Sequence, residues 1–326
     1  MLRHFTGAVA SCVLAALLTT SATAATAATA RPPLVAGAGE VRDLARSFDE
    51  FWQRTQQLDE AERVAAFKRD IAAQFPDFYG VERYNGSRTQ AQQDAIIAKS
   101  LAAYPALRAD YLRKTRQFEL DLPRYTASFQ ATFADYRQLQ PIYFLHSFGE
   151  MDGGTRELNG AAYLIFGIDG MVRYHGAMDE AAFFHHELFH IYHAAALDAC
   201  SSDTVWVRLW SEGLATYVSH VLNPGADEKA LLLDMPEGLA VRTRKVQQSA
   251  LAQLAGVLDS SDRAITAGLF SLSGGDDTGL PARRGYYLGY LVAQEAARGR
   301  TLQQLARLDC KASREVVGAA LQRLRG

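Results

Sequence analysis

The spacing of apolar residues predicts a helical first part of the chain. From residue 40 to about residue 136, apolar side chains recur at helical intervals, as at Val41, Leu44, Phe48 and Trp52. No residue pattern typical of catalysis or metal binding occurs in this stretch. We therefore interpret residues 31–140 as a linker followed by a helical N-terminal region whose aromatic residues form a core.

Polar residues and prolines suggest where these helices begin and end. Acidic residues follow Asp59, as is typical of the first turn of a helix. Residues 87–90 resemble a capping box and predict a further helix that runs to about Tyr104. Proline disrupts a helix interior, so Pro105 is expected to end this helix and Pro123 to divide the two that follow.

The pattern changes near residue 141, where short apolar runs alternate with turn residues. Residues 142–145 and 161–167 are predicted strands, and the polar stretch 149–159 between them is a predicted loop. The Asp-Gly pair within 168–171 predicts a tight turn, followed by a short third strand at 171–174. A small sheet is thus expected in this part of the chain.

Helical spacing returns after residue 178 and continues to the C-terminus. The fold class expected is α+β, mostly helical, with a small sheet before the first of these later helices. Residues 141–326 are interpreted as one catalytic region. The predicted helices are 179–200, 203–222, 226–233, 236–258, 261–270, 281–298, 301–308 and 313–324.

The first 30 residues have the pattern of a secretory signal peptide. A basic start precedes an apolar run over residues 8–18, and small-residue cleavage sites follow at 22–24, 25–27 and 28–30. The run is too short for a transmembrane helix. We expect an exported protein, periplasmic or secreted, that begins between Ala25 and Arg31 and has no stable membrane anchor.

The three cysteines bear on both processing and folding. Cys12 lies in a loose lipoprotein-like sequence, but the apolar run continues past it, which disfavours lipid attachment. Cleavage would leave Cys200 and Cys310, and two thiols in an exported chain commonly pair. We predict a Cys200–Cys310 disulfide; the alternative is two free, buried thiols.

Charge disfavours one class of partner. The formal net charge is −2 and no long basic run is present. Nucleic-acid binding proteins usually carry a basic patch or stripe. We therefore expect no nucleic-acid partner.

One short stretch carries most of the candidate chemistry. His186, Glu187 and His190 form the pattern H-E-x-x-H. On a helix, residues four apart share a face, so the two imidazoles can bind one metal ion while the Glu acts as general base on a water molecule. The alternative is a helix with several satisfied or exposed histidines. Flanking Phe, Leu, Ile and Tyr residues leave little other polar surface, and a buried His or Glu needs a partner.

A third metal ligand is expected from the next helix. Catalytic zinc usually has three protein ligands. Glu212 lies on the predicted helix that follows, and an antiparallel pair of helices can bring it opposite the two histidines. Gly213 would let these two helices approach closely. The alternative is that Glu212 is a surface carboxylate.

These residues resemble a known enzyme family. H-E-x-x-H followed by Trp210-x-Glu212-Gly213-x-Ala215-x-Tyr217 is similar to the gluzincin metallopeptidases. The resemblance covers roughly residues 141–298. It implies that His186, His190 and Glu212 bind zinc and that Glu187 is the general base.

The resemblance extends to a second helix and an edge strand. Tyr286, in a Tyr-x-x-Gly element, corresponds to a tyrosine that faces the tetrahedral intermediate in gluzincins. The glycines at 153–154 and the strand at 161–166 stand where the family places its substrate-binding edge strand. The resemblance therefore implies a zincin-like fold and a peptide or protein substrate.

Two departures limit what the resemblance implies. The interval to Glu212 is longer than in the aminopeptidase branch, and no Gly-x-Met-Glu-Asn element precedes the metal helix. Aminopeptidase activity is therefore not expected. His193 does not fit the metzincin spacing, and His185 and His193 are expected to support the site or the fold. Two alternatives to a zinc peptidase remain: a zinc hydrolase of a non-peptide amide, and a zinc-binding module without turnover.

Overall fold

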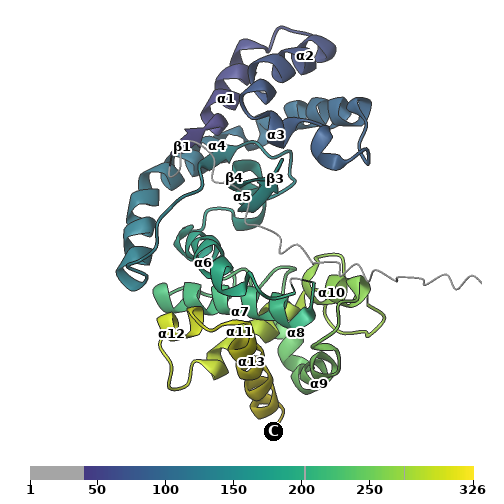
Figure 1. Cartoon of the computed structure of the whole chain (residues 1–326). Coiled ribbons are helices and arrows are strands. Elements are labelled where there is room, and N and C mark those ends of the chain that lie inside the picture. The colour runs from purple at the N-terminus through teal and green to yellow at the C-terminus, as the bar shows by residue number, and fades with distance from the viewer. Residues whose placement is uncertain (1–39, 202, 275) are drawn as a thin grey trace, which may run out of the picture. The chain divides into compact units, whose positions relative to one another are not determined.

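The computed structural model describes residues 40–201, 203–274 and 276–326. The described residues belong to one compact unit, and its main hydrophobic cluster takes side chains from both the N-terminal helices and the later ones. The fold is α+β and mostly helical, as predicted (Figure 1). The predicted signal peptide, its cleavage sites and Cys12 lie outside the described residues.

The sheet has four strands in the order β1-β2-β4-β3. β2 (Ile142–Leu145) and β4 (Ala161–Gly167) are the two predicted strands, and they pair in parallel. β1 (Val41–Asp43) extends the parallel part, whereas β3 (Gly153–Leu158) runs antiparallel along the outer edge of β4. The predicted loop at 149–159 was therefore wrong over β3, because pairing with β4 orders a polar segment that has little strand propensity.

The predicted turn and third strand at 168–174 were also wrong, because α5 (Ile168–His175) occupies this segment. Ile168, Met171 and His175 are buried at helical intervals along it. The Asp169 carboxylate accepts hydrogen bonds from the backbone N–H groups of Ser147 and Gly149. Asp169, which was predicted to form a local turn, therefore binds the backbone of a distant segment instead.

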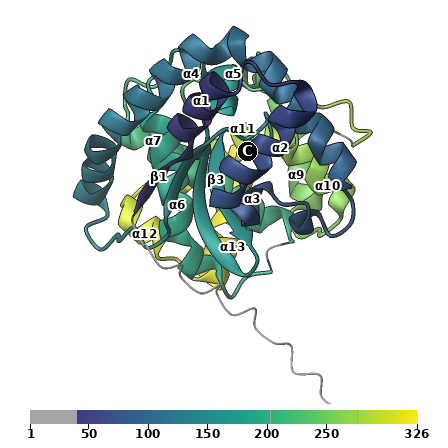
Figure 2. The same cartoon turned by 90° about the horizontal axis from the view of Figure 1, so that it is seen from above.

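The N-terminal region is helical as predicted, but its prolines do not end the main helix. α1 (Leu44–Arg54), α2 (Glu60–Asp70) and α3 (Pro76–Tyr79) precede α4 (Gln90–Thr132), with 3₁₀ turns at Ala72–Gln74 and Glu82–Tyr84. Thr89, within the predicted capping segment, caps α4. Figure 2 shows α4 curving along one side of the molecule.

Packing explains why α4 continues through Pro105 and Pro123. A proline in a helix interior costs about 3 kcal/mol relative to alanine. α4 buries an aromatic side chain every seven residues, at Tyr104, Tyr111, Phe118 and Tyr125, and each is almost fully enclosed. Burying a large side chain stabilises the fold by about 1.5–3 kcal/mol, so the aromatic face outweighs the two prolines.

Aromatic side chains of the N-terminal region cover both faces of the sheet. On one face of the sheet, the rings of Phe144 and Phe166 contact Phe118 of α4. On the other face, Tyr143 and Tyr163 contact Phe75. Side chains alternate between the faces of a strand, so both faces of this sheet are covered by helical segments.

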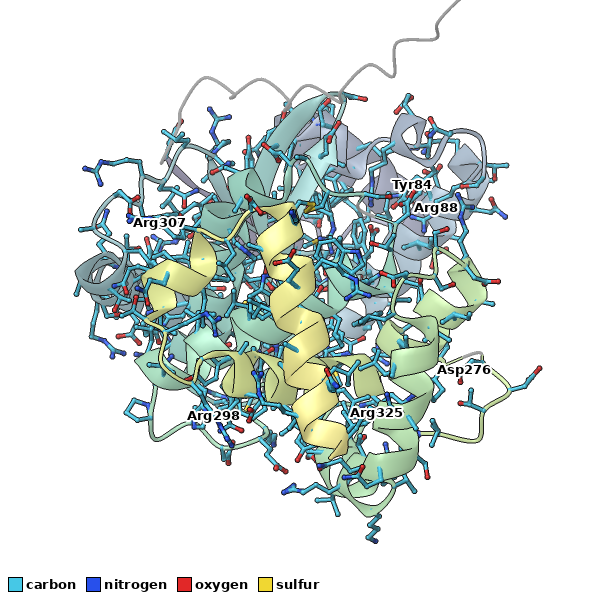
Figure 3. The ribbon with its side chains drawn as sticks, turned by 60° about the horizontal axis from the view of Figure 1, so that its bottom comes forward. Tyr84, Arg88, Asp276, Arg298, Arg307 and Arg325 are labelled. Atoms are coloured by element: carbon cyan, nitrogen blue, oxygen red, sulfur yellow. A yellow bond between two sulfur atoms is a disulfide. The ribbon has the colours of Figure 1, made fainter. Side chains whose placement is uncertain are left out.

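The later helices follow the prediction with two corrections. The predicted helix at 226–233 is a series of turns, and the predicted helix at 236–258 is divided at Val246. Its two parts belong to the set of later helices, in which α13, the yellow helix at the centre of Figure 3, packs against α7, α9 and α11. The set comprises α6 (Ala181–Leu197), α7 (Val205–Leu222), α8 (Leu239–Lys245), α9 (Gln247–Val257), α10 (Arg263–Phe270), α11 (Arg284–Ala296), α12 (Leu302–Ala306) and α13 (Cys310–Arg325).

A disulfide joins Cys200 to Cys310, with the two Cα atoms 5.5 Å apart. This confirms the predicted pairing. It connects the segment after α6 to the first residue of α13 across 110 positions of sequence. Among the described residues, no helix is both long and apolar enough to cross a membrane.

Candidate functional site

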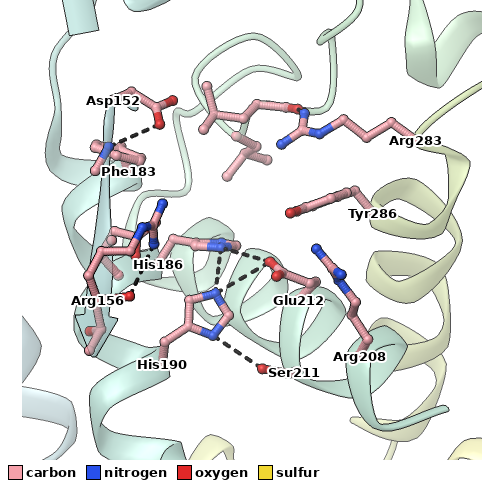
Figure 4. Close-up of a pocket in the computed structure, with 16 residues that line it drawn as sticks. Asp152, Arg156, Phe183, His186, His190, Arg208, Ser211, Glu212, Arg283 and Tyr286 are labelled. Carbon is pink, nitrogen blue, oxygen red and sulfur yellow. Dashed lines mark hydrogen bonds and ion pairs between the residues drawn. The ribbon is translucent and has the colours of Figure 1, made fainter. Parts of the chain in front are cut away.

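α6 is fixed by its aromatic residues, and this orients its polar face. The ring of Phe166 in β4 contacts Phe183 and Phe184 at the start of α6. His186 and His190 follow at one-turn spacing and line a cavity of about 390 Å³ together with Glu212 of α7. Figure 4 shows the three side chains pointing toward one another.

The three predicted ligands converge on one point: both nitrogen-to-carboxylate distances match those around a tetrahedral zinc, whereas the nitrogen-to-nitrogen distance is shorter. The Nε2 atoms of His186 and His190 are 2.9 Å apart, and each is 3.4 Å from Glu212 Oε2. Donor atoms about 2.0–2.1 Å from a tetrahedral zinc lie about 3.3–3.4 Å from one another. The structure therefore brings together His186, His190 and Glu212 as a group that could hold a metal.

The outer nitrogens of both imidazoles contact hydroxyl groups. His190 Nδ1 is 3.2 Å from Ser211 Oγ, and His186 Nδ1 is 3.4 Å from Thr216 Oγ1. Thr216 donates its own proton to the carbonyl of Glu212, so it can accept one from His186. Hydrogen on the outer nitrogens leaves both Nε2 lone pairs facing the same point.

Charge supports the same assignment. Burial opposes ionisation of Glu212, but the two imidazoles hold the pKa of its carboxyl well below the usual range. Burial also disfavours protonated His190, yet Glu212 raises the pKa of His190 overall. A protonated Nε2 of one imidazole can donate its hydrogen to only one neighbour, either the other Nε2 or the Glu212 carboxylate. A dication can bind both nitrogens and the carboxylate at once. The residues present thus fit a divalent metal ion, such as zinc.

Glu187 is separate from these three donors but lines the same cavity. Its side chain is almost fully buried, and it accepts no hydrogen bond from the described residues. Burial raises the pKa of Glu187 above its ordinary value. A Cβ atom on Gly154 would lie 3.4 Å from Glu187 Oε2, so this glycine, with a φ of +135°, keeps space open between β3 and the carboxylate.

Tyr286 lies across the cavity on α11, as the sequence suggested. Figure 4 shows its hydroxyl directed toward the cavity. Burial raises the pKa of Tyr286, so the phenol remains protonated at neutral pH. By contrast, the hydroxyl of Tyr290 is 2.7 Å from His220 Nδ1, outside the set of cavity residues.

Gly213 acts differently from the prediction. A Cβ atom on Gly213 would lie 2.2 Å from the carbonyl carbon of Gly289, so the close approach is between α7 and α11. α6 and α7 pack against each other as expected, but Gly213 serves the contact with α11 instead. Because Gly289 follows Tyr286 by one turn, this contact sets how near Tyr286 comes to the helix that carries Glu212.

The other two histidines of α6 do not face the cavity. His185 Nε2 lies 2.8 Å from Ser128 Oγ and 3.0 Å from the Tyr125 carbonyl, while its Nδ1 is 2.9 Å from Asn223 Nδ2. His185 therefore joins α6 to α4 and to the end of α7. His193 is buried without a hydrogen-bonding partner among the described residues, and burial lowers its pKa to about 3.

Sequence reasoning missed a second polar group that reaches the cavity. The ring of His175 contacts Glu180 Oε2 at 2.6 Å through Nδ1 and Asp152 Oδ2 at 3.2 Å through Nε2. Glu180 also pairs with the buried Lys114 of α4. We call these four residues the Lys114–Asp152 network. Its members are scattered over three segments, so no local spacing could have identified it.

Sequence reasoning also missed three arginines that line the cavity: Arg156 of β3, Arg208 of α7 and Arg283 at the start of α11. Isolated arginines are common on surfaces and carry no motif. The position of Arg208, one turn before Glu212, was the only available signal. Compared with known proteins, the chain matches no family model, no curated protein and no solved structure.

Proposed function

We propose that the protein is a zinc-dependent peptide hydrolase similar to the gluzincins. The observation that carries the proposal is the convergence of His186, His190 and Glu212 in a cavity that Glu187 also lines. Structural zinc sites generally have four protein ligands, often cysteines. A three-donor site beside an uncommitted carboxylate is typical of catalysis.

Each of these residues would have a separate role in hydrolysis. His186, His190 and Glu212 would hold zinc, which when bound acidifies water and polarises a carbonyl group. Glu187 would accept the proton of the attacking water on its carboxylate and return it to the leaving amine. The Tyr286 hydroxyl would donate a hydrogen bond to the developing oxyanion.

A peptide is favoured over a non-peptide amide by the sheet. β3 is an edge strand: it pairs with β4 on one side, and its first residues line the cavity. An exposed strand edge binds an extended peptide through backbone hydrogen bonds. This edge supports a peptide or protein substrate that lies beside Glu187.

We also propose that the protein acts outside the cytoplasm. The supporting observation is the Cys200–Cys310 disulfide, because disulfides persist mainly in oxidising compartments. Amino-terminal sequencing of the protein from the periplasm or medium tests this. A start between Ala25 and Arg31 is expected; an uncleaved chain retained in the cytoplasm would contradict it.

The central experiment combines metal analysis with a peptide digest. Purified protein should contain about one zinc per chain and cleave members of a mixed peptide library, with cleavage abolished by a chelator and restored by zinc. Full zinc without cleavage of any peptide would favour the inactive zinc-binding module. Cleavage of small non-peptide amides alone would favour the alternative hydrolase.

A further inference from the structure

The wall of the cavity opposite β3 carries positive charge that the described protein residues do not neutralise. Arg208 of α7 and Arg283 at the start of α11 lie on either side of Tyr286 (Figure 4). Neither guanidinium lies within 4.0 Å of a carboxylate among residues 40–201, 203–274 and 276–326. Arg156, on the β3 side, likewise has no acidic partner there.

The acidic side chains of the cavity are already committed. Asp152 contacts His175, and Glu212 contacts the two metal-site imidazoles. Glu187 is the one remaining acidic side chain among the described cavity residues, whereas three arginines line the cavity. A bound dication would add further positive charge. A concave site with this balance attracts anions.

Arg208 is an exposed residue that contacts the ring of Phe270. Its guanidinium lies 5.1 Å from the ring centre of Phe270, and it donates no hydrogen bond to the described residues. Arg208 also lines an adjoining cavity of about 450 Å³, together with Arg263 and Asp203. An aromatic ring orients a guanidinium while leaving its N–H groups free for a ligand.

Arg283 makes some of the hydrogen bonds that its guanidinium could make. It stacks on Tyr286 with 3.9 Å between its guanidinium carbon and the ring centre, and its Nη1 donates to the carbonyls of Leu232 and Met235. None of its N–H groups contacts a carboxylate among the described residues. Arg283 thus fixes the turn after residue 230 to the cavity wall and retains donors for a substrate.

We propose that this wall, defined as Arg208 and Arg283, binds a carboxylate of the peptide substrate close to the bond that is cleaved. Guanidinium groups bind carboxylates through paired, charge-assisted hydrogen bonds. The carboxylate is either the C-terminus of the peptide or an acidic side chain. The inference rests on the proposed peptide hydrolysis and adds the class of substrate.

The first experiment measures kcat/KM with matched peptides. One pair differs only by Glu or Gln beside the cleaved bond, and a second pair differs only by a free or amidated C-terminus. Wild-type protein should prefer the carboxylate in at least one pair by about ten- to a hundredfold. The pair that shows the preference identifies the source of the carboxylate.

The variants locate this preference. Arg208→Gln should bring the kcat/KM ratio of the two matched peptides close to one, and Arg208→Lys should restore part of the preference. Arg208 is the better first target because Arg283 also holds backbone carbonyls. Arg116→Gln, on the exposed surface of α4, is the matched control and should behave as wild type. No preference in wild type, or an equal preference in Arg208→Gln, would overturn the proposal.

A binding measurement separates this proposal from the proposed hydrolysis. In a Glu187→Gln background, calorimetry with the same peptides should show tighter binding of the carboxylate member, and adding Arg208→Gln should remove the difference. If wild type cleaves nothing but this difference persists, hydrolysis is wrong and the carboxylate site stands. If wild type cleaves peptides but Arg208 has no effect on either measurement, the carboxylate site is wrong.

Discussion

The group of His186, His190 and Glu212 and the Lys114–Asp152 network are built from similar residue types, yet only the network is satisfied by the protein. In the network, Lys114 and His175 face Glu180 and Asp152, so two cations balance two anions, and each close contact has a donor and an acceptor. In the other group, two imidazole nitrogens face each other beside one carboxylate.

The comparison shows how to separate a structural cluster from a metal-binding one. Buried charges are tolerated when the protein pairs them and completes their hydrogen bonds. Where lone pairs converge on one point and the remaining hydrogens are directed outward, a cation would satisfy the group. Location alone does not distinguish the two, since Asp152 of the network lines the same cavity as the three donors.

The largest effect is expected from Glu187, which belongs to neither group of bonded charges. Glu187→Gln should retain zinc and fold but lose about 10³–10⁴-fold in kcat, because the change keeps the shape and removes the base. Turnover of a cleaved peptide at equal zinc content is the measurement. Wild-type turnover in this variant would disprove the general-base mechanism.

Replacing one of His186, His190 and Glu212 tests whether these three residues bind a metal. Glu212→Ala should lose most of its bound zinc, as should His186→Ala and His190→Ala, because two protein donors bind zinc much more weakly than three. Glu180→Gln, in the network, is the comparison and should keep about one zinc per chain. Elemental analysis that finds full zinc in Glu212→Ala would exclude Glu212 as a ligand.

Tyr286 is expected to matter less than Glu187. Tyr286→Phe should lower kcat by about 10²–10³-fold, as is typical for one oxyanion donor. Tyr287→Phe should be nearly silent because Tyr287 points about 100° away on the helix. Tyr290→Phe should also have a small effect, since the Tyr290 hydroxyl contacts His220. Equal losses in all three variants would indicate a change in α11 packing instead.

The smallest effect concerns the network and appears in stability. Burial disfavours protonated His175, but Asp152 and Glu180 outweigh it and raise its pKa from 6.5 to about 9. Because the pKa of His175 is higher in the folded than in the unfolded protein, protonation of His175 stabilises the fold. This stabilisation is complete below pH 6.5 and is lost as the pH rises through 9. The difference corresponds to about 3 kcal/mol.

Urea unfolding at several pH values between 6 and 10 would measure this contribution. The free energy of unfolding of wild type should fall across this range, and His175→Gln should be less stable at pH 6 and show a flatter profile. Identical profiles for wild type and variant would mean that His175 is not protonated in the folded state.

Local patterns predicted the local features of the fold. The strands β2 and β4 and the helix α6 were found from apolar spacing, and the disulfide followed from the two cysteines expected to remain after cleavage. Predictions failed where distant contacts outweigh local preference. α4 continues through two prolines because its aromatic face is buried, and β3 forms because β4 is beside it.

In the candidate site, the sequence alone determined the relation of His186, Glu187 and His190, because spacing along one helix fixes which side chains share a face. Only the tertiary structure decided that Glu212 reaches the two histidines, that Gly213 and Gly289 bring α11 close, and that Arg208 and Arg283 line the opposite wall. These residues are distant in sequence, so their proximity depends on how helices pack, which no local spacing encodes.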